Sequence, residues 1–195
     1  MSAAAKSPGW SSTGTGERAL ADLGLPSDVV PGDKNDPDRV AVDRQRLERG
    51  EMTTSEDFDA AVERYHQAAG EFVKGNNETY KALFSQGEDV TVANPFFPAT
   101  RGWKNVEDRM DRAAARWSEG EVIGFENIIK YVSGDLGYIL EIERFHAKIG
   151  GSQEAGPVAL RVTSILRRED GEWKIVHRHA DPITTEQPAE SVKQS

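Results

Sequence analysis

Two histidines near the C-terminal end of the chain, His177 and His179, are the first candidates for chemistry. They are two residues apart in a segment whose alternation predicts a strand, so we expect both side chains on one face of it. Trp173 and Ile175 would share that face, which indicates the covered side of a sheet. Imidazole titrates near neutral pH and Asp181 can orient one ring, so the group predicts acid–base catalysis. The alternative is a pair of structural histidines hydrogen-bonded within the sheet.

Two glutamates with the same spacing, Glu141 and Glu143, fall on one face of an earlier predicted strand. In an apolar pocket a carboxyl group has a raised pKa and acts as an acid or base, whereas on the surface it cross-links strands. Arg161, on the following strand, is expected either to pair on the surface, to pair with a glutamate, or to act as counter-ion for a substrate carboxylate or enolate. The candidate catalytic residues are His177, His179, Asp181 and Glu141.

A metal site is the weaker interpretation of the same histidines. The His-x-His spacing suits zinc, with a third ligand from Glu141, Glu143 or His146, but such a pair alone is a weak signal. We therefore expect no metal and no cofactor. Because the sequence contains no cysteine, disulfides, thiolate nucleophiles and cysteine-ligated metal centres are excluded.

Aromatic side chains are numerous enough in this chain to line a pocket for a molecule of one or two rings, although most of them belong in the core. The expected ligand is a small apolar molecule. The candidate ligand-binding residues combine aromatic surface with hydrogen-bonding groups and are Asn94, Trp103, Arg161, Tyr65, Phe96 and Trp117.

Strands in the second half of the chain must position these residues. Alternating residues and glycine-containing turns predict four long strands in an antiparallel meander, over residues 121–132, 136–149, 158–168 and 172–180. A shorter strand, 89–94, is expected to end at Pro95 and to lead into an aromatic loop that contains Phe96 and Phe97.

Helical patterns precede most of the strands, over residues 54–74, 77–86 and 105–119. A hydroxyl at Thr54 and an acid at Asp57 are expected to cap the first of these helices, and Asn105 the third. Helices followed by a long antiparallel sheet imply an α+β domain in which the helices cover one face of the sheet.

Composition divides the chain into an arm, a domain and a tail. Residues 1–53 are rich in Gly, Pro, Ser and Asp and are expected to be largely irregular, with short helices at 17–25 and 40–49. Residues 54–182 are the domain and 183–195 the tail. A formal net charge of −9 disfavours nucleic acid and anionic membranes as partners. Without a signal segment or a run of transmembrane length, we expect a cytoplasmic protein.

Three motifs within this order of elements carry a family resemblance: Val92-Ala93-Asn94-Pro95, Arg101-Gly102-Trp103, and the closing segment Asp-Gly-Glu-Trp-Lys-Ile-Val-His-Arg-His at 170–179. Residues 55–182 resemble the SnoaL-like branch of the nuclear transport factor 2 (NTF2-like, ketosteroid isomerase-like) superfamily. The resemblance implies a cone, in which a long curved antiparallel sheet is covered on its concave face by three N-terminal helices.

This superfamily contains isomerases, cyclases, dehydratases, hydrolases and kinase association domains, so the resemblance leaves two hypotheses. The first is a small-molecule-binding protein or cofactor-independent acid–base enzyme that takes an apolar oxygenated substrate. The second is a non-catalytic module that forms a homodimer through the outer face of the sheet. In steroid isomerase relatives a carboxylate before a proline is the general base. Asn94 holds that place here, and an amide binds a carbonyl or hydroxyl, or forms a turn, but does not accept a proton.

Overall fold

The structure is a computed structural model that describes residues 37–49 and 52–193. Its helices are α2 (Pro37–Glu48), α3 (Thr54–Phe72), α4 (Glu78–Lys81), α5 (Trp103–Ala114) and the short 3-10 helix η1 (Ala189–Val192). The helix expected at 40–49 is confirmed as α2, whereas the one expected at 17–25 lies outside the described residues. Within the described ranges no helix is long and apolar enough to cross a membrane.

The strands of the described residues form one six-stranded sheet with the spatial order β2-β1-β6-β5-β4-β3. They are β1 (Thr91–Asn94), β2 (Phe97–Arg101), β3 (Trp117–Ser133), β4 (Leu136–Ile149), β5 (Gly156–Glu169) and β6 (Glu172–Asp181). The four long strands pair antiparallel with one another in sequence, which confirms the predicted meander. Strand β1 pairs parallel with β6, so the whole sheet is mixed and not purely antiparallel as expected.

Strand β2 corrects the prediction of an aromatic loop after Pro95. Phe97 pairs with Asn94 across a tight turn, and β2 continues antiparallel to β1. The Asn94 Oδ1 accepts hydrogen bonds from the backbone N–H groups of Phe96 (2.9 Å) and Phe97 (3.1 Å). Because one asparagine side chain satisfies both amides of the turn, the residues that follow are free to pair as a strand.

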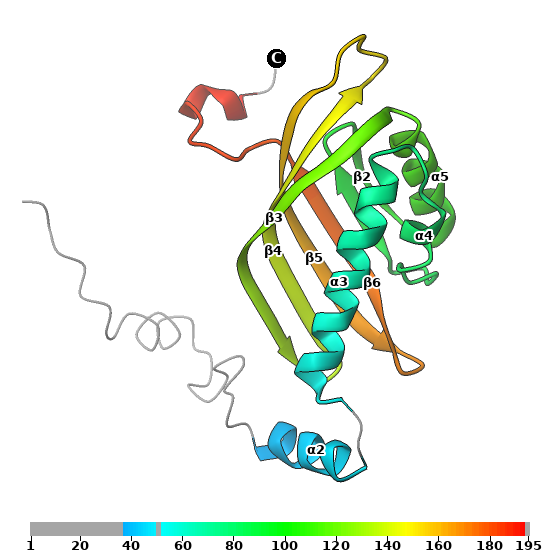
Figure 1. Ribbon diagram of the computed structural model, residues 1–195, viewed down its shortest axis with the longest axis vertical. Coiled ribbons are helices and arrows are strands. Elements are labelled where there is room, and N and C mark those ends of the chain that lie inside the picture. Colours follow the sequence, from blue (N-terminus) through cyan, green and yellow to red (C-terminus); the bar gives the residue numbers. More distant parts are fainter. Residues whose placement is uncertain (1–36, 50–51, 194–195) are drawn as a thin grey trace, which may run out of the picture. The chain divides into compact units, whose positions relative to one another are not determined.

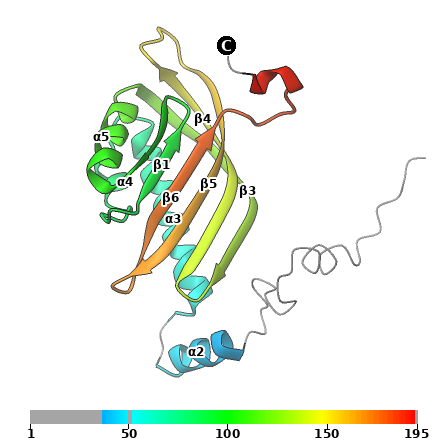
Figure 2. The same cartoon turned by 180° about the vertical axis from the view of Figure 1, so that it is seen from behind.

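Helices α3, α4 and α5 lie on one face of the sheet, and the long strands curve around them (Figures 1 and 2). This arrangement confirms the predicted α+β cone. Helix α3 buries the apolar stripe expected from the sequence, including Phe58, Ala61, Val62, Tyr65 and Ala69. Burying such side chains is the main favourable term in the folding free energy, at about 25 cal/mol per Å² of apolar surface.

The helix ends differ slightly from the predicted ones. The N-cap of α3 is Thr53, whose hydroxyl accepts from the Glu56 backbone N–H while the Glu56 side chain accepts from the Thr53 N–H, one residue before the expected cap. Helix α5 begins at Trp103, so Asn105 lies in its first turn and does not cap it. Trp117 is the first residue of β3, although the sequence placed it at the end of a helix.

A bulge in β6 decides which of its side chains face the helices. The pairing of β5 with β6 shifts between Ile165 and Leu166, which leaves Val176 as an extra residue on β6. Before the bulge, Trp173 and Ile175 are buried in the core. An extra residue reverses the alternation of every side chain beyond it.

Beyond the bulge, Arg178 and Ala180 take the positions that face the helices. His177 and His179 alternate with them and lie on the other face of the sheet. The prediction that these histidines share a face with the two core residues before the bulge is therefore wrong.

Candidate functional site

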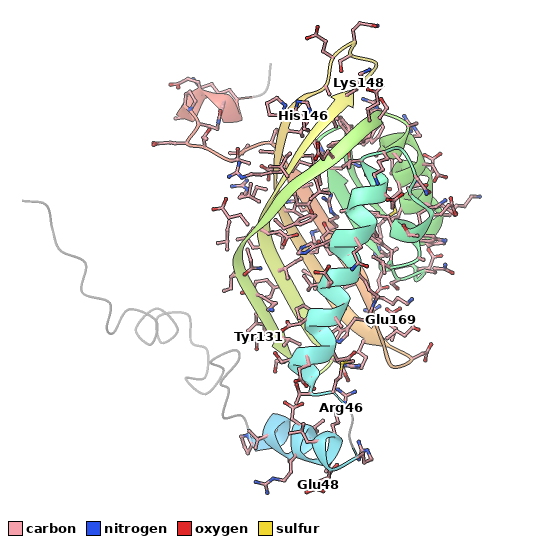
Figure 3. All side chains as sticks on the ribbon, in the orientation of Figure 1. Arg46, Glu48, Tyr131, His146, Lys148 and Glu169 are labelled. Atoms are coloured by element: carbon pink, nitrogen blue, oxygen red, sulfur yellow. The ribbon has the colours of Figure 1, made fainter. Side chains whose placement is uncertain are left out.

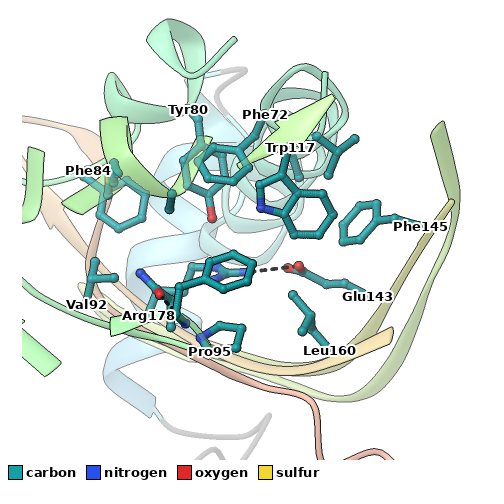
Figure 4. Close-up of a pocket in the computed structure, with 16 residues that line it drawn as sticks. Phe72, Tyr80, Phe84, Val92, Pro95, Trp117, Glu143, Phe145, Leu160 and Arg178 are labelled. Atoms are coloured by element: carbon teal, nitrogen blue, oxygen red, sulfur yellow. Dashed lines mark hydrogen bonds and ion pairs between the residues drawn. The ribbon is translucent and has the colours of Figure 1, made fainter. Parts of the chain in front are cut away.

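A cavity lies on the concave side, between the sheet and the helices (Figure 4). It contains about 580 Å³ of space not filled by atoms, including the open volume at its mouth. Its polar and charged lining residues are Tyr80, Asn94, Glu143 and Arg178. The remaining lining residues are apolar: Ala69, Phe72, Val73, Phe84, Val92, Pro95, Phe96, Met110, Ala113, Trp117, Phe145 and Leu160. An apolar pocket with a few convergent polar groups is the usual form of a small-molecule site.

Two charged residues on the cavity wall, Glu143 of β4 and Arg178 of β6, form an ion pair. Arg178 Nη2 donates to Glu143 Oε2 (2.8 Å), and Arg178 Nε donates to the Tyr65 hydroxyl (2.9 Å). The Tyr65 hydroxyl in turn donates to Glu143 Oε1. Because the Arg178 and Glu143 side chains are only 11% and 2% exposed, their charges are largely removed from water. We call Tyr65, Glu143 and Arg178 the cone cluster.

The surroundings of the cone cluster change how its groups hold protons. Burial raises the pKa of Glu143 above its ordinary value, an effect that the Arg178 guanidinium and the Tyr65 hydroxyl oppose. Burial also raises the pKa of Tyr65 well above 10 and the pKa of Tyr80 to about 12, so both phenols are neutral donors at neutral pH. A carboxyl group with a raised pKa on a cavity wall is a candidate for general acid–base chemistry.

Three donors are placed to meet a ligand oxygen. Arg178 Nη1 and Asn94 Nδ2 belong to lining residues, and neither makes a hydrogen bond with any residue in the described part of the chain. The Tyr80 hydroxyl points into the cavity, toward the Glu143–Arg178 pair (Figure 4). A bound carbonyl or hydroxyl oxygen can therefore be held without disturbing the cone cluster.

A second buried carboxylate, Glu141, lies on the same face of β4 but does not line the cavity. Both of its oxygens contact His66 Nε2 of α3, at 3.0 and 3.2 Å. The His66 ring stacks on Phe125 of β3, with ring centroids 3.8 Å apart and planes 9° apart. The face of β4 that bears Glu141 and Glu143 is thus the covered face, which the sequence left open.

Four of the predicted site residues meet on the outer face of the sheet, away from the cavity. Arg161 Nη2 donates to Asp181 Oδ2 (2.9 Å), and His179 Nε2 lies 3.8 Å from the same oxygen. His177 Nδ1 is 2.8 Å from the Thr91 hydroxyl, and burial, followed by the charge of His179, lowers its pKa. We call Arg161, His177, His179 and Asp181 the outer-face cluster. The catalytic role of His177, His179 and Asp181 and the ligand-binding role of Arg161 stay predictions.

The other predicted ligand-binding residues divide between the cavity and its surroundings. Asn94, Phe96 and Trp117 line the cavity, and Tyr65 lies behind it in the cone cluster. Trp103 packs against the core without lining the cavity.

Sequence reasoning missed Arg178 and His66. Arg178 carries no signal in the spacing of its strand, because the bulge that turns it inward is invisible in a period-2 pattern. His66 directly follows Tyr65, at the edge of the buried stripe of α3. This position was the one indication in the sequence that the His66 imidazole lies against the sheet.

A more open apolar hollow adjoins the cavity and shares part of its wall. The shared residues are Pro95, Phe96, Trp117 and Leu160, and the hollow continues over Ile149, Pro157, Val158, Ala159 and Pro182. The aromatic rings of Phe96 and Trp117 therefore stand between the cavity and an apolar surface outside it.

Metal-ligating side chains do not gather anywhere in the described ranges: no three His, Asp or Glu residues there are grouped to hold an ion. His146, the third ligand in the zinc interpretation, is exposed near the end of β4, where Figure 3 also labels Lys148.

Solved structures with the same fold come from several bacteria. A proposed dehydratase of the NTF2-like family from Streptomyces avermitilis is 19% identical, with a TM-score of 0.56 over 67% of this chain and 96% of that chain. An NTF2-like superfamily protein from Salmonella enterica is 16% identical, with a TM-score of 0.56 over 69% and 94%. A ketosteroid isomerase-like protein from Erwinia carotovora atroseptica is 16% identical, with a TM-score of 0.52 over 67% and 96%. At these identities the likeness shows the fold.

No match was found among curated proteins. The SnoaL-like domain family matches residues 59–184, which is well over half of the chain and includes the whole cone cluster. With the NTF2-like fold of the neighbours above, this match shows that the chain belongs to the SnoaL-like domain family.

Proposed function

We propose that this domain binds a small, mainly apolar, oxygen-bearing molecule in the cavity and transfers a proton on it with Glu143. The observation that carries the proposal is one buried carboxyl group, with its pKa raised by burial, on the wall of an otherwise mostly apolar cavity. Apolar walls supply affinity for the body of the ligand, and the few polar groups fix its orientation.

The proposed chemistry uses groups that are already in place. Glu143 accepts a proton from a carbon or hydroxyl of the bound molecule, and negative charge develops on the neighbouring ligand oxygen. Arg178 Nη1 and the Tyr80 hydroxyl are the donors that stabilise this charge. Isomerisation, cyclisation and dehydration of oxygenated molecules all contain such a step. The similarity to proteins named as a proposed dehydratase and as ketosteroid isomerase-like supports this class of reaction.

The test compares Glu143→Gln with the wild type. Native mass spectrometry of the full chain, purified without denaturation, identifies the molecule retained in the cavity, and NMR in D₂O follows the exchange of its hydrogens with solvent. Because Gln cannot accept the proton, we expect Glu143→Gln to keep the bound molecule but to slow exchange by about 100-fold or more.

Glu141→Gln is the matched control, because Glu141 is equally buried on the same face of β4 but does not line the cavity. We expect it to exchange hydrogens at close to the wild-type rate. A wild-type protein that retains no molecule, or a Glu143→Gln variant that exchanges at the wild-type rate, would contradict the proposal.

Association of two copies through the sheet is the second candidate function, and one observation favours it. Four large apolar side chains on the edge strand β3 and at the start of β4 are 42–61% exposed; they are Ile123, Ile128, Ile129 and Leu136. Large apolar side chains that stay exposed along one edge of a sheet are candidates for a protein–protein contact. Sedimentation of the wild type and an Ile123→Ser/Ile128→Ser variant tests this candidate: a dimer that becomes a monomer supports it, and a wild-type monomer contradicts it.

A further inference from the structure

Two arginines of helix α5 and a third in the turn that follows it gather around one aromatic ring. The guanidinium carbons of Arg109, Arg112 and Arg116 lie 5.1, 4.6 and 4.8 Å from the centroid of the Phe97 ring. A cation near an aromatic ring is attracted by the electrons of the ring, so Phe97 favours the approach of three like charges that would otherwise separate. We call Arg109, Arg112 and Arg116 the arginine cluster.

The charge of the arginine cluster is mostly uncompensated. Arg112 lies 3.6 Å from Asp108 in an exposed pair, whereas Arg109 and Arg116 form no ion pair with any described residue. Because each cation lies within 5.1 Å of the ring centroid, no two of them are more than about 10 Å apart, a separation close to the Debye length at physiological ionic strength (roughly 8 Å). Their fields therefore add, and they form a positive patch on a chain whose formal net charge is −9.

The contacts with Phe97 leave the guanidinium groups able to bind an anion. Within the described residues the guanidinium N–H groups of Arg109, Arg112 and Arg116 make no hydrogen bond, so these donors are available. Two parallel N–H donors match the geometry of a carboxylate, sulfonate or phosphate.

Phe96 connects this patch to the cavity. Its ring lines both the cavity and the outer hollow, and the Arg116 guanidinium carbon lies 5.2 Å from the ring centroid. A molecule whose apolar body fills the cavity therefore lies one aromatic ring away from the cations. Inside the cavity, the positive charge of Arg178 is balanced by Glu143. The cavity itself therefore offers an anion no unpaired cation comparable with those of the arginine cluster.

We propose that the arginine cluster binds an anionic group carried by the molecule whose apolar body occupies the cavity. This inference rests on the proposed function, which it deepens by naming the ligand class as an apolar molecule with a carboxylate, sulfonate or phosphate. The outer end of the ligand is then fixed by charge, and its inner end is presented to Glu143.

Two fluorescent probes that differ by one anionic group test the inference. N-phenyl-1-naphthylamine is apolar and neutral, and 8-anilinonaphthalene-1-sulfonate is the same ring system with a sulfonate. Each is titrated into the full chain and into the Arg112→Gln/Arg116→Gln variant, whose changed residues are exposed. We expect the variant to weaken sulfonate binding at least fivefold and to leave binding of the neutral probe unchanged. Added sodium chloride should weaken binding of the sulfonate probe and leave binding of the neutral probe unchanged.

The control variant, Arg144→Gln/Lys130→Gln, removes the same net charge from two exposed cations that pair with Glu126 and Asp59. It should leave the ratio of the two affinities unchanged. The inference is overturned if the ratio is the same in Arg112→Gln/Arg116→Gln and wild type, or if the control lowers it equally. If the neutral probe binds but Arg112→Gln/Arg116→Gln does not change the ratio of the two affinities, the inference is overturned and the proposed function stands. If neither probe binds, both are overturned.

Discussion

Two arginine–carboxylate pairs on opposite faces of the same sheet have almost the same length but different surroundings. Arg178 Nη2 lies 2.8 Å from Glu143 Oε2 in the cone cluster, and Arg161 Nη2 lies 2.9 Å from Asp181 Oδ2 in the outer-face cluster. The inner side chains are 11% and 2% exposed, whereas the outer ones are 45% and 17% exposed. Distance alone therefore does not rank ion pairs, because burial decides how far the loss of one partner destabilises the fold.

The largest expected effect is that of Arg178→Met, which leaves Glu143 buried without its counter-ion. We expect the free energy of unfolding to fall by about 3–5 kcal/mol at neutral pH, as measured by urea denaturation. Glu143→Gln/Arg178→Met, which removes both charges, is the matched control and should recover much of the loss. A loss below about 1 kcal/mol would place the inner pair in the same energetic class as an exposed pair.

The loss in Arg178→Met should also depend on pH. The folded-state pKa of Glu143 is raised above its ordinary value of 4.5, so its contribution to stability is fully present below that value and is lost as pH rises through the folded pKa. Arg178 opposes this rise, so its removal raises the pKa of Glu143 further. The variant should therefore approach the wild type as the pH is lowered from 8 to 5, and a difference that is constant with pH would contradict this explanation.

An intermediate effect is expected from His66→Ala, because it removes the hydrogen-bond partner of the buried Glu141 carboxylate. We expect a loss of about 1–3 kcal/mol in the free energy of unfolding, the cost of leaving one buried polar group unsatisfied. Gln67→Ala, at the exposed neighbouring position of α3, is the control and should change the stability little. Equal losses in the two variants would show that the helix, not the carboxylate, is responsible.

The smallest expected effect is that of Arg161→Gln in the outer-face cluster. An exposed pair contributes about 0–1 kcal/mol, so the midpoint of urea denaturation should hardly move. The small difference should also vanish in about 1 M sodium chloride, where the Debye length is about 3 Å. A loss of unfolding free energy that does not depend on salt and is comparable with that of Arg178→Met would show that the outer pair matters as much as the buried one.

The sequence predicted those parts of the fold that depend on uninterrupted patterns. Strand β4 pairs with β5 without a bulge, so Glu141 and Glu143 were correctly placed on one face, but both faces carry apolar residues and the sequence left open which of them is buried. The stripe of α3 was equally clear, because its period of 3.6 residues runs for five turns. The cone followed from the order of these elements and from the resemblance to a family.

The candidate site was predicted only in part, since its key residues depend on pairing between distant segments. Val176 is an extra residue only relative to β5, so no pattern within β6 shows that Arg178 turns inward. His66 gains its partner from β4, across 75 positions of sequence. Asn94, Phe96 and Trp117, three of the predicted ligand-binding residues, line the cavity, and their part in binding stays a prediction.

The parallel pairing of β1 with β6 means that the sheet is completed only after β6, the last strand in the described part of the chain, has been synthesised. Glu143 leaves the ribosome before β6, which supplies Arg178 and closes the sheet against β1. Until β6 docks, burial of Glu143 is unfavourable because its partner Arg178 is not yet in place. One edge of β5 is also unpaired during this time and is open to pairing with other chains. Contacts between distant segments form slowly, so the interval in which a chaperone can act ends with the docking of β6.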